Sequence, residues 1–394
     1  MKLIFAERMK YVKKSFIREI LKITQNPEVI SFAGGLPNPS SFPLEEIETA
    51  TQKILEKDGR SILQYGTTEG YLPLRTYIAE RYDKRFGLKI NPEEILITNG
   101  SQQALDLLSK ALINEGDDVL IERPAYLGAI QSLSFYQPNL LSVTLNDDGV
   151  DLESLAKLLE THQPKFFYSV PTFQNPSGLT YSLENRKELA KLLTQHNVLL
   201  VEDDPYSELR FLGEEIPPIK CIMGDYGILL GSFSKIVSPG MRLGWVVAAP
   251  EIMDKLIIAK QAADLHTNNF SQRVVYQYLI DNDLDAHIEK IKVMYKARCT
   301  FMSEMIKQYF PPEVKVTQPE GGMFMWATLP DGISSMKLME LAAMEKVAFV
   351  PGDPFYVNEI NVPTLRLNYT NSDNVLIEEG IKRLGTVIKT LMNA

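Results

Sequence analysis

The sequence of 394 residues holds few of the side chains that bind metal ions or form disulfides. Its two cysteines, Cys221 and Cys299, lie far apart and have no ligand spacing. The four histidines show no i, i+4 pairs and no clusters with carboxylates, at His162, His196, His266 and His287. We therefore expect no metal site, because zinc ligands come as closely spaced groups. Isolated cysteines also indicate a reduced, intracellular protein without a disulfide framework.

Long apolar runs and an excess of positive charge are also missing. No apolar run approaches the roughly 20 residues that a membrane-spanning helix needs. The start of the chain, MKLIFAERMK, has only four apolar residues in a row, too few for a signal peptide. Lysine and arginine number 41 against 50 aspartates and glutamates, a formal net charge of -9, whereas phosphate-backbone binding needs a dense basic face. We expect a cytoplasmic protein that binds neither membrane nor nucleic acid.

The composition is that of an ordinary globular protein, with 45% apolar and 23% charged residues, and the length suggests about two or three domains. From residue 95 to about 250, short apolar runs such as ILIT, DVLIE and VLLVEDD alternate with helical patterns. This alternation predicts an α/β fold whose mostly parallel sheet is covered by helices on both faces. In such sheets, ligands bind beyond the carboxyl ends of the strands.

The pattern changes after residue 250. Two long helical stretches run to about residue 310, and VKVTQPEGGMFMWATLP, KVAFVPG and TLRLNYT then read as strands before a final helix. These elements predict a second, smaller α+β domain. We expect an N-terminal arm with part of the small domain at 1–45, a large domain at 46–282 and a C-terminal small domain at 283–394.

Polar residues stand at the ends of several expected strands. In NGSQQALDLL, Ser101 and Gln102 begin a helix after a strand; free N–H groups there can bind phosphate, although plain helix caps look the same. Asn175 lies in the proline-stiffened loop of FFYSVPTFQNPSG. Asp203 ends an apolar run, with Tyr206 three residues on. Such an acid can simply cap a turn, but its burial is unfavourable unless a cation meets it.

The segment GSFSKIVSPGMR interrupts two apolar runs with Ser232, Ser234, Lys235 and Arg242. It also follows a strand, so its side chains should meet those of the other strand ends in one pocket. That pocket offers a phosphate site, an anion for a ring nitrogen and a reactive amine, which together fit pyridoxal 5'-phosphate. We expect Lys235 to form a Schiff base with the cofactor, and the serines and Arg242 to hold its phosphate with the Ser101–Gln102 helix start.

Several segments occur in the order found in one known family: FAGGLPNPSSFP, QYGTTEGYLPLR, TNGSQQAL, ERPAY, PTFQNPSG, VEDDPY, SFSKIVSPGMRLGW and LRLNYT. Over nearly its full length, the chain resembles the fold type I aminotransferases of class I/II. The resemblance is strongest to the branch of α-aminoadipate and kynurenine aminotransferases, which includes the effector domains of MocR-type regulators. It implies the α/β fold of that family, a homodimer and pyridoxal 5'-phosphate as the cofactor of the large domain.

The resemblance also implies roles for the matching residues around the cofactor ring. Asp203 would pair with the pyridinium nitrogen, and Asn175 and Tyr206 would hydrogen-bond the ring hydroxyl oxygen. Tyr126 of ERPAY would stack on the ring face. Arg366 of LRLNYT would clamp the substrate α-carboxylate, which suits a planar, bidentate guanidinium.

Three further residues are implied at the edge of the site. Tyr65 would reach the cofactor phosphate of the neighbouring subunit, and Gly35 of the glycine loop would border the substrate. Arg18, in SFIREIL, would swing into the pocket to pair with acidic substrates and withdraw for apolar ones. An arginine on an exposed helix face is the plain alternative for Arg18.

The implied activity is transfer of an amino group between an L-amino acid and a 2-oxo acid. Lys235 would move the proton from the substrate α-carbon, which needs a lowered pKa, with Asp203 and Tyr206 completing the catalytic set. Donors could be 2-aminoadipate, aromatic or branched-chain amino acids, with 2-oxoglutarate as the acceptor. Alternatives are a lyase or decarboxylase on the same fold, or a non-catalytic sensor domain. A nicotinamide dehydrogenase is excluded, because no Gly-x-Gly-x-x-Gly follows the first strand.

Overall fold

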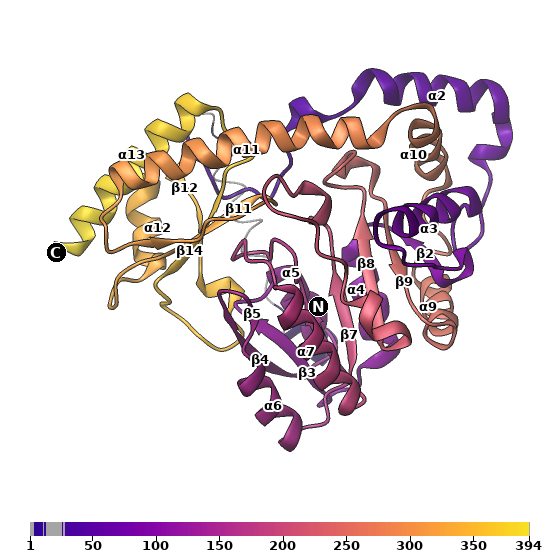
Figure 1. Cartoon of the computed structure of the whole chain (residues 1–394), viewed down its shortest axis with the longest axis horizontal. Coiled ribbons are helices and arrows are strands. Elements are labelled where there is room, and N and C mark those ends of the chain that lie inside the picture. The colour runs from indigo at the N-terminus through magenta and orange to yellow at the C-terminus, as the bar shows by residue number, and fades with distance from the viewer. Residues whose placement is uncertain (1–3, 11, 13–25, 27, 394) are drawn as a thin grey trace.

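The computed structural model describes residues 4–10, 12, 26 and 28–393, and its largest feature is an eight-stranded sheet (Figure 1). The strand order is β2-β9-β8-β7-β6-β3-β4-β5. β9 is antiparallel to β2 and β8, β5 is antiparallel to β4, and the other neighbours are parallel. The prediction of a mostly parallel sheet is therefore confirmed. In sheet order, the bounds are Ile95–Thr98, Gly244–Val247, Gly227–Ser232, Leu199–Asp203, Phe166–Ser169, Asp118–Arg123, Asn139–Asn146 and Gly149–Val150.

Helices cover both faces of this sheet because successive side chains of a strand point to opposite faces. On β3, Leu120 packs in a cluster with α6 and α7, whereas Val119 and Ile121 belong to the core cluster that includes α4 and α5. β7 divides in the same way, with Leu200 in the first cluster and Val201 in the second. The bounds are Ser101–Leu112 for α4, Leu127–Ser134 for α5, Leu152–Thr161 for α6 and Leu183–Gln195 for α7.

The remaining helices of the larger unit lie toward the β2 edge or connect strands. They are α2 (Leu44–Asp58), α3 (Leu72–Phe86), α8 (Lys220–Met223), α9 (Pro250–Ala263) and α10 (Asn269–Asp281). Short 3-10 helices occur at Glu7–Lys10, Pro39–Ser41, Gly59–Leu63, Pro92–Glu94, Ser207–Leu209, Gly224–Tyr226, Pro239–Met241 and Asp353–Phe355.

A smaller α+β unit follows, as expected from the sequence. Its antiparallel sheet has the order β10-β11-β14-β13, with bounds Lys315–Val316, Phe324–Thr328, Thr364–Asn368 and Val350–Pro351. Its helices are α11 (Leu284–Tyr309), α12 (Ser335–Met344) and α13 (Asn374–Met392). Figure 1 shows α11 running from this unit across to α10 of the larger one. The domain boundaries after residues 45 and 282 stay a prediction.

The N-terminal segment pairs with the smaller unit. β1 (Ile30–Ser31) and β12 (Val347–Ala348) form a parallel two-stranded sheet. Phe32 then donates its N–H to the carbonyl of Ala348 and accepts the N–H of Asn368. The chain that follows Phe32 is thereby held beside β14.

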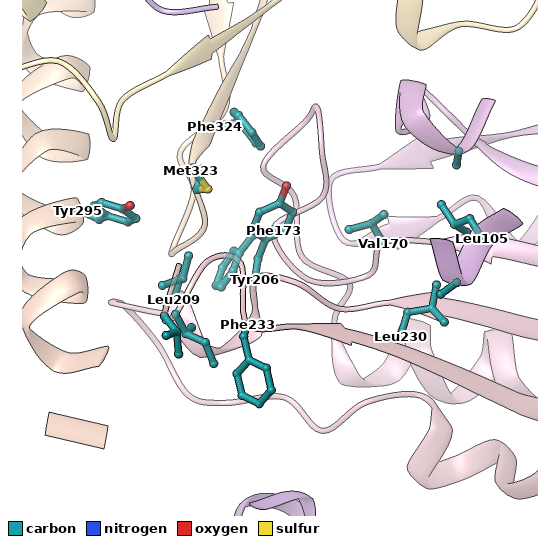
Figure 2. Packing of buried hydrophobic residues seen from close by; sticks show 14 of the residues in the cluster. Leu105, Val170, Phe173, Tyr206, Leu209, Leu230, Phe233, Tyr295, Met323 and Phe324 are labelled. Carbon is teal, nitrogen blue, oxygen red and sulfur yellow. The ribbon is translucent and has the colours of Figure 1, made fainter. Parts of the chain in front are cut away.

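One hydrophobic cluster continues across both units. Phe173, Tyr206 and Leu209 of the larger unit belong to the same buried cluster as Met323 and Phe324 of the smaller one (Figure 2). The rings of Tyr206 and Phe324 meet edge to face at 6.0 Å between centroids. This shared core sets the position of β11 and β14 relative to the carboxyl ends of the large sheet.

The end of β8 is shaped by a glycine next to a tryptophan. Gly231 pairs with Trp245 across the β8–β9 ladder, and a Cβ on Gly231 would lie 2.2 Å from Cε2 of that indole. The indole is itself fixed, since its ring packs on Phe233 and its N–H donates to the Tyr82 hydroxyl at 3.2 Å. Only glycine at 231 leaves room for this arrangement.

We expect Gly231→Ala to lower the free energy of unfolding by about 1–3 kcal/mol, because the added methyl must displace Trp245 or the strand. Gly240→Ala is the matched control: its Cβ would meet only the Ser238 hydroxyl oxygen, at 3.7 Å, and its φ is not left-handed. Urea unfolding of the two cofactor-free variants measures the difference. Equal stabilities would contradict the packing argument.

Candidate active site

A cavity of about 300 Å³ lies at the carboxyl ends of β6, β7 and β8. The larger unit supplies its floor, and β11, β14 and the N-terminal segment supply the opposite wall. The predicted site residues that line it are Gly35, Ser101, Gln102, Tyr126, Asn175, Asp203, Tyr206, Ser232, Ser234, Lys235, Arg242 and Arg366. Residues that lie more than 300 positions apart in the sequence, such as Gly35 and Arg366, thus line the same cavity.

Two predicted residues are not part of this lining. Tyr65 is 79% exposed, and its ring contacts His266 edge to face, with centroids 5.7 Å apart. Its role in a neighbouring subunit stays a prediction. Arg18 lies outside the described residues, so its role in substrate selection also stays a prediction.

Asp203 is the last residue of β7 and is 2% exposed. Its Oδ2 accepts a hydrogen bond from the Tyr168 hydroxyl at 2.8 Å, while its buried Oδ1 has no hydrogen-bond partner among the described residues. Burial, and then the charges of Asp204 and Glu122, raise the pKa of Asp203 to about 7 against the opposing Tyr168 bond. A buried acceptor without a partner is unfavourable, so Oδ1 suits a donor from a bound molecule.

Lys235 follows the end of β8 and points its amine into the same cavity. Its Nζ donates to the carbonyl oxygen of Gly35 at 2.9 Å, which ties the N-terminal segment to the site. Burial, then the positive charges of Arg366 and Arg242, lower the pKa of Lys235 to about 8. The neutral, nucleophilic and basic form of the amine is therefore more populated near neutral pH than in an ordinary lysine.

Arg366 stands in the middle of β14 and is 1% exposed. Its Nη1 donates to Asn175 Oδ1 at 2.8 Å and its Nη2 to the Ala33 carbonyl at 2.9 Å, and its guanidinium lies 4.2 Å from the Phe324 ring centroid. No carboxylate of the described chain forms an ion pair with it, and burial lowers its pKa to about 10. A buried guanidinium held only by neutral groups is suited to a carboxylate from a ligand.

An anion site lies where α4 begins. Gly100 precedes the helix with φ 76°, and a Cβ there would come within 2.7 Å of Arg242 Nη2, so only glycine permits this approach. Arg242, itself left-handed at φ 53°, donates through Nη2 to the Asn99 carbonyl at 2.9 Å. Ser232 Oγ accepts the Ser234 N–H at 3.1 Å nearby. Free N–H groups at the start of α4, hydroxyls and a guanidinium together suit a phosphate.

Two phenols complete the cavity. Burial raises the pKa of Tyr126 to about 12 and also raises the pKa of Tyr206, so both hydroxyls stay protonated and can donate. Tyr126 stands just before α5 and lines the cavity together with the anion site and Arg366. With the unpartnered Asp203 oxygen, the amine and the anion site, the cavity fits the ring, aldehyde and phosphate of pyridoxal 5'-phosphate.

Some residues of the site were missed by sequence reasoning. The further lining residues are Leu36, Gly100, Val170, Pro205, Pro239 and Phe324. Tyr168 was missed too, although a phenol in the apolar strand FFYS is a usable signal, because a buried phenol needs a partner. Phe324 carries no such signal, since an aromatic residue in a strand is ordinarily core.

The described part of the chain contains neither a metal site nor a membrane-spanning helix. No group of three His, Cys, Asp or Glu side chains there could hold a metal ion. No helix among the described residues combines the length and the apolar composition needed to cross a membrane.

Comparison with known proteins gives consistent matches along the chain. Residues 28–384 match the family described as aminotransferase class I and II. The chain is 44% identical to aromatic-amino-acid aminotransferase 1 of Thermococcus litoralis, covering 98% of this chain and 94% of that protein. It is 43% identical to the 2-aminoadipate transaminase of Thermus thermophilus, covering 97% and 95%.

Solved structures agree with these matches. A kynurenine aminotransferase from Pyrococcus horikoshii, crystallised with PMP, is 44% identical and superimposes with a TM-score of 0.95, covering 99% of this chain and 98% of the other. An α-aminoadipate aminotransferase from Thermus thermophilus, complexed with N-(5'-phosphopyridoxyl)-L-leucine, gives a TM-score of 0.92 at 41% identity, with the same coverage.

The lowered pKa of Lys235 can be tested in cofactor-free protein. Amines react only when neutral, so reaction of Lys235 with an amine-specific reagent should be half-maximal near pH 8, and Arg366→Gln should move this midpoint upward. Lys157 is the internal control, because its hydrogen bond to Glu153 raises its pKa. Competitive labelling with peptide mapping measures both lysines in one sample. A Lys235 midpoint at the ordinary 10.5 would contradict the prediction.

Proposed function

Since the chain belongs to the class I and II aminotransferases, we propose that this pyridoxal 5'-phosphate-dependent enzyme takes aromatic amino acids and 2-aminoadipate as donors and 2-oxoglutarate as acceptor. Branched-chain amino acids are further candidate donors. The observation that carries the proposal is the buried Arg366, which no acid of the described chain pairs with, beside an apolar wall of Phe324, Leu36 and Val170. An α-carboxylate on Arg366 would leave the substrate side chain against that wall.

When bound, the cofactor supplies an aldehyde that combines with amines and a ring that accepts the electron pair released at the substrate α-carbon. We assign the electrostatic control of that ring to Asp203. Its unpartnered Oδ1 would accept the ring N–H, and a cation there reverses the effect of burial, so that Asp203 is ionised. Lys235 would hold the cofactor aldehyde through its Nζ. Once the amino group of the substrate has taken its place there, Nζ would take the proton from the substrate α-carbon.

The other cavity residues would bind and orient. Asn175 and Tyr206 would hydrogen-bond the ring hydroxyl oxygen, and Tyr126 would cover the ring face. Asn175 would also border the substrate, because its Oδ1 already accepts from Arg366. Gly35 would lie beside the substrate, where even a methyl group would approach the Phe324 ring at 3.5 Å. The phosphate would be held by Ser101, Gln102, Ser232, Ser234 and Arg242.

A screen of amino donors with 2-oxoglutarate tests this function. We expect wild-type protein to form glutamate from phenylalanine, tyrosine, kynurenine or 2-aminoadipate, and Lys235→Ala to lose at least about 100- to 10,000-fold in rate, since the proton carrier is gone. Lys157→Ala, at an exposed lysine far from the cavity, is the matched control and should keep the wild-type rate.

Other outcomes of the same screen would contradict the proposal. Release of carbon dioxide or ammonia from the donor without use of 2-oxoglutarate would indicate a decarboxylase or lyase. Tight cofactor binding without turnover of any donor would indicate a sensor.

We also propose that the enzyme is a cytoplasmic homodimer whose active sites take Tyr65 from the partner subunit. Leu63, Tyr65 and Leu265 are 71%, 79% and 56% exposed, and the ring of Tyr65 contacts His266, the neighbour of Leu265 in the sequence. Exposed apolar surfaces of this kind favour association. The free cysteines Cys221 and Cys299 support a reducing compartment.

Mixing two inactive variants tests the shared site. In a hybrid of Lys235→Ala with Tyr65→Ala, one site would combine an intact Lys235 with an intact Tyr65, so equal mixing should restore about a quarter of the wild-type activity. A mixture of Lys235→Ala with Asp203→Asn is the control. Each of these substitutions damages the site of the chain that carries it, so no site of the hybrid is repaired. Absence of recovery after verified subunit exchange would place Tyr65 in its own site.

A further inference from the structure

A buried lysine lies behind the anion site without lining the cavity. Lys260 stands in the last turn of α9, and its side chain is 0% exposed. Its Nζ lies 2.9 Å from Asp264 Oδ1, 3.0 Å from Asp264 Oδ2 and 2.9 Å from Gln103 Oε1. A buried ammonium is unfavourable unless it is fully paired, so this arrangement is a specific one.

Asp264 and Gln103 in turn hold both ends of one residue, Asn99. The Asn99 side-chain amide donates to Asp264 Oδ2 at 2.6 Å, and the Asn99 backbone N–H donates to Gln103 Oε1 at 2.9 Å. Gln103 Nε2 also donates to Asp264 Oδ2, at 2.6 Å, which closes the network. Asn99 therefore has little freedom to rotate.

Asn99 is the residue whose carbonyl accepts from Arg242. That hydrogen bond, 2.9 Å long, sets the guanidinium against Gly100, where a methyl group would already collide with Nη2. The same turn continues into Ser101, the first residue of α4. The network thus fixes both halves of the anion site, the N–H groups at the helix start and the guanidinium.

A surface role does not explain this lysine. Burial lowers the pKa of Lys260, although the hydrogen bond and the charge of Asp264 oppose that shift. Replacing a buried ion pair by apolar groups is often neutral for stability, so its stabilising effect alone does not account for it. Fixing the geometry of a ligand site from outside its contact shell is a known use of such a network.

We propose that Lys260 and Asp264 are positioning residues that hold the Asn99–Ser101 turn and the Arg242 guanidinium in the geometry that binds the cofactor phosphate. This inference rests on the proposed function, in which Arg242 and the start of α4 bind that phosphate. Neither Lys260 nor Asp264 lines the cavity, so their effect should be confined to the phosphate end that they support.

The test compares binding of pyridoxal 5'-phosphate and of unphosphorylated pyridoxal to cofactor-free protein. For Lys260→Met, we expect the dissociation constant of the phosphorylated form to rise about tenfold, the equivalent of one hydrogen bond to a charged group, while that of pyridoxal stays within about twofold. Asn99→Ala should likewise raise the dissociation constant of the phosphorylated form and spare that of pyridoxal, because it removes the side-chain bond to Asp264. Lys157→Met, which breaks an exposed lysine–glutamate pair, is the control and should change neither constant.

Each result decides between the alternatives. Equal weakening of both ligands by Lys260→Met would mean a general structural role and would overturn the proposal, as would wild-type constants. If Lys260→Met does not fold, Asn99→Ala decides, since Asn99 is only partly buried. Arg242→Ala distinguishes a failure of the proposed phosphate site from a failure of the positioning role. If it leaves the preference for the phosphorylated form intact, the proposed phosphate site is wrong; if it abolishes that preference while the Lys260 and Asn99 variants keep it, only the positioning role is wrong.

Discussion

Asp203 carries one carboxylate oxygen bonded to Tyr168 and a second that has no hydrogen-bond partner in the described chain, although both are buried at the end of a strand. The neighbouring buried acid, Glu122, shows the usual arrangement: its oxygens accept four hydrogen bonds from the surrounding strand ends and loop. Two buried acids of one sheet, on β3 and on β7, therefore have different surroundings. The satisfied acid orders the loop that carries Asn175, and the unsatisfied one leaves a buried oxygen available to a donor from a bound molecule.

The positive groups of the cavity follow the same logic. Lys235, Arg242 and Arg366 line one small space, and none of them forms an ion pair with an acid in the described part of the chain. Their mutual repulsion adds to burial in lowering the pKa of Lys235. A cavity with this balance of charge attracts a phosphate and a carboxylate, and each of these anions would relieve the repulsion when it binds. The pKa of Lys235 is thus lowered by the same positive groups that would attract these anions.

The wall opposite the large sheet depends on the N-terminal segment. Phe32 is hydrogen-bonded to the smaller unit, so the carbonyls of Ala33 and Gly35 face the cavity, where they accept from Arg366 and Lys235. One short segment therefore links the Lys235 amine to the Arg366 guanidinium. This link explains how the N-terminal segment, which precedes all strands of the large sheet in the sequence, comes to line the cavity.

The sequence by itself determined the alternation of strands and helices, the smaller α+β unit and the polar groups at strand ends, because side-chain periodicity and strand-end chemistry are local properties. The amine, the acid and the helix start of the anion site could be predicted because each stands at the end of a strand or shortly after it. The tertiary structure decided which distant groups meet them: Tyr168 on Asp203, the Gly35 carbonyl on Lys235, and Phe324 under Arg366. The network of Lys260 was also beyond sequence reasoning. Contacts between α9, α4 and the turn before it depend on how helices pack on a sheet, and no spacing along the chain encodes that packing.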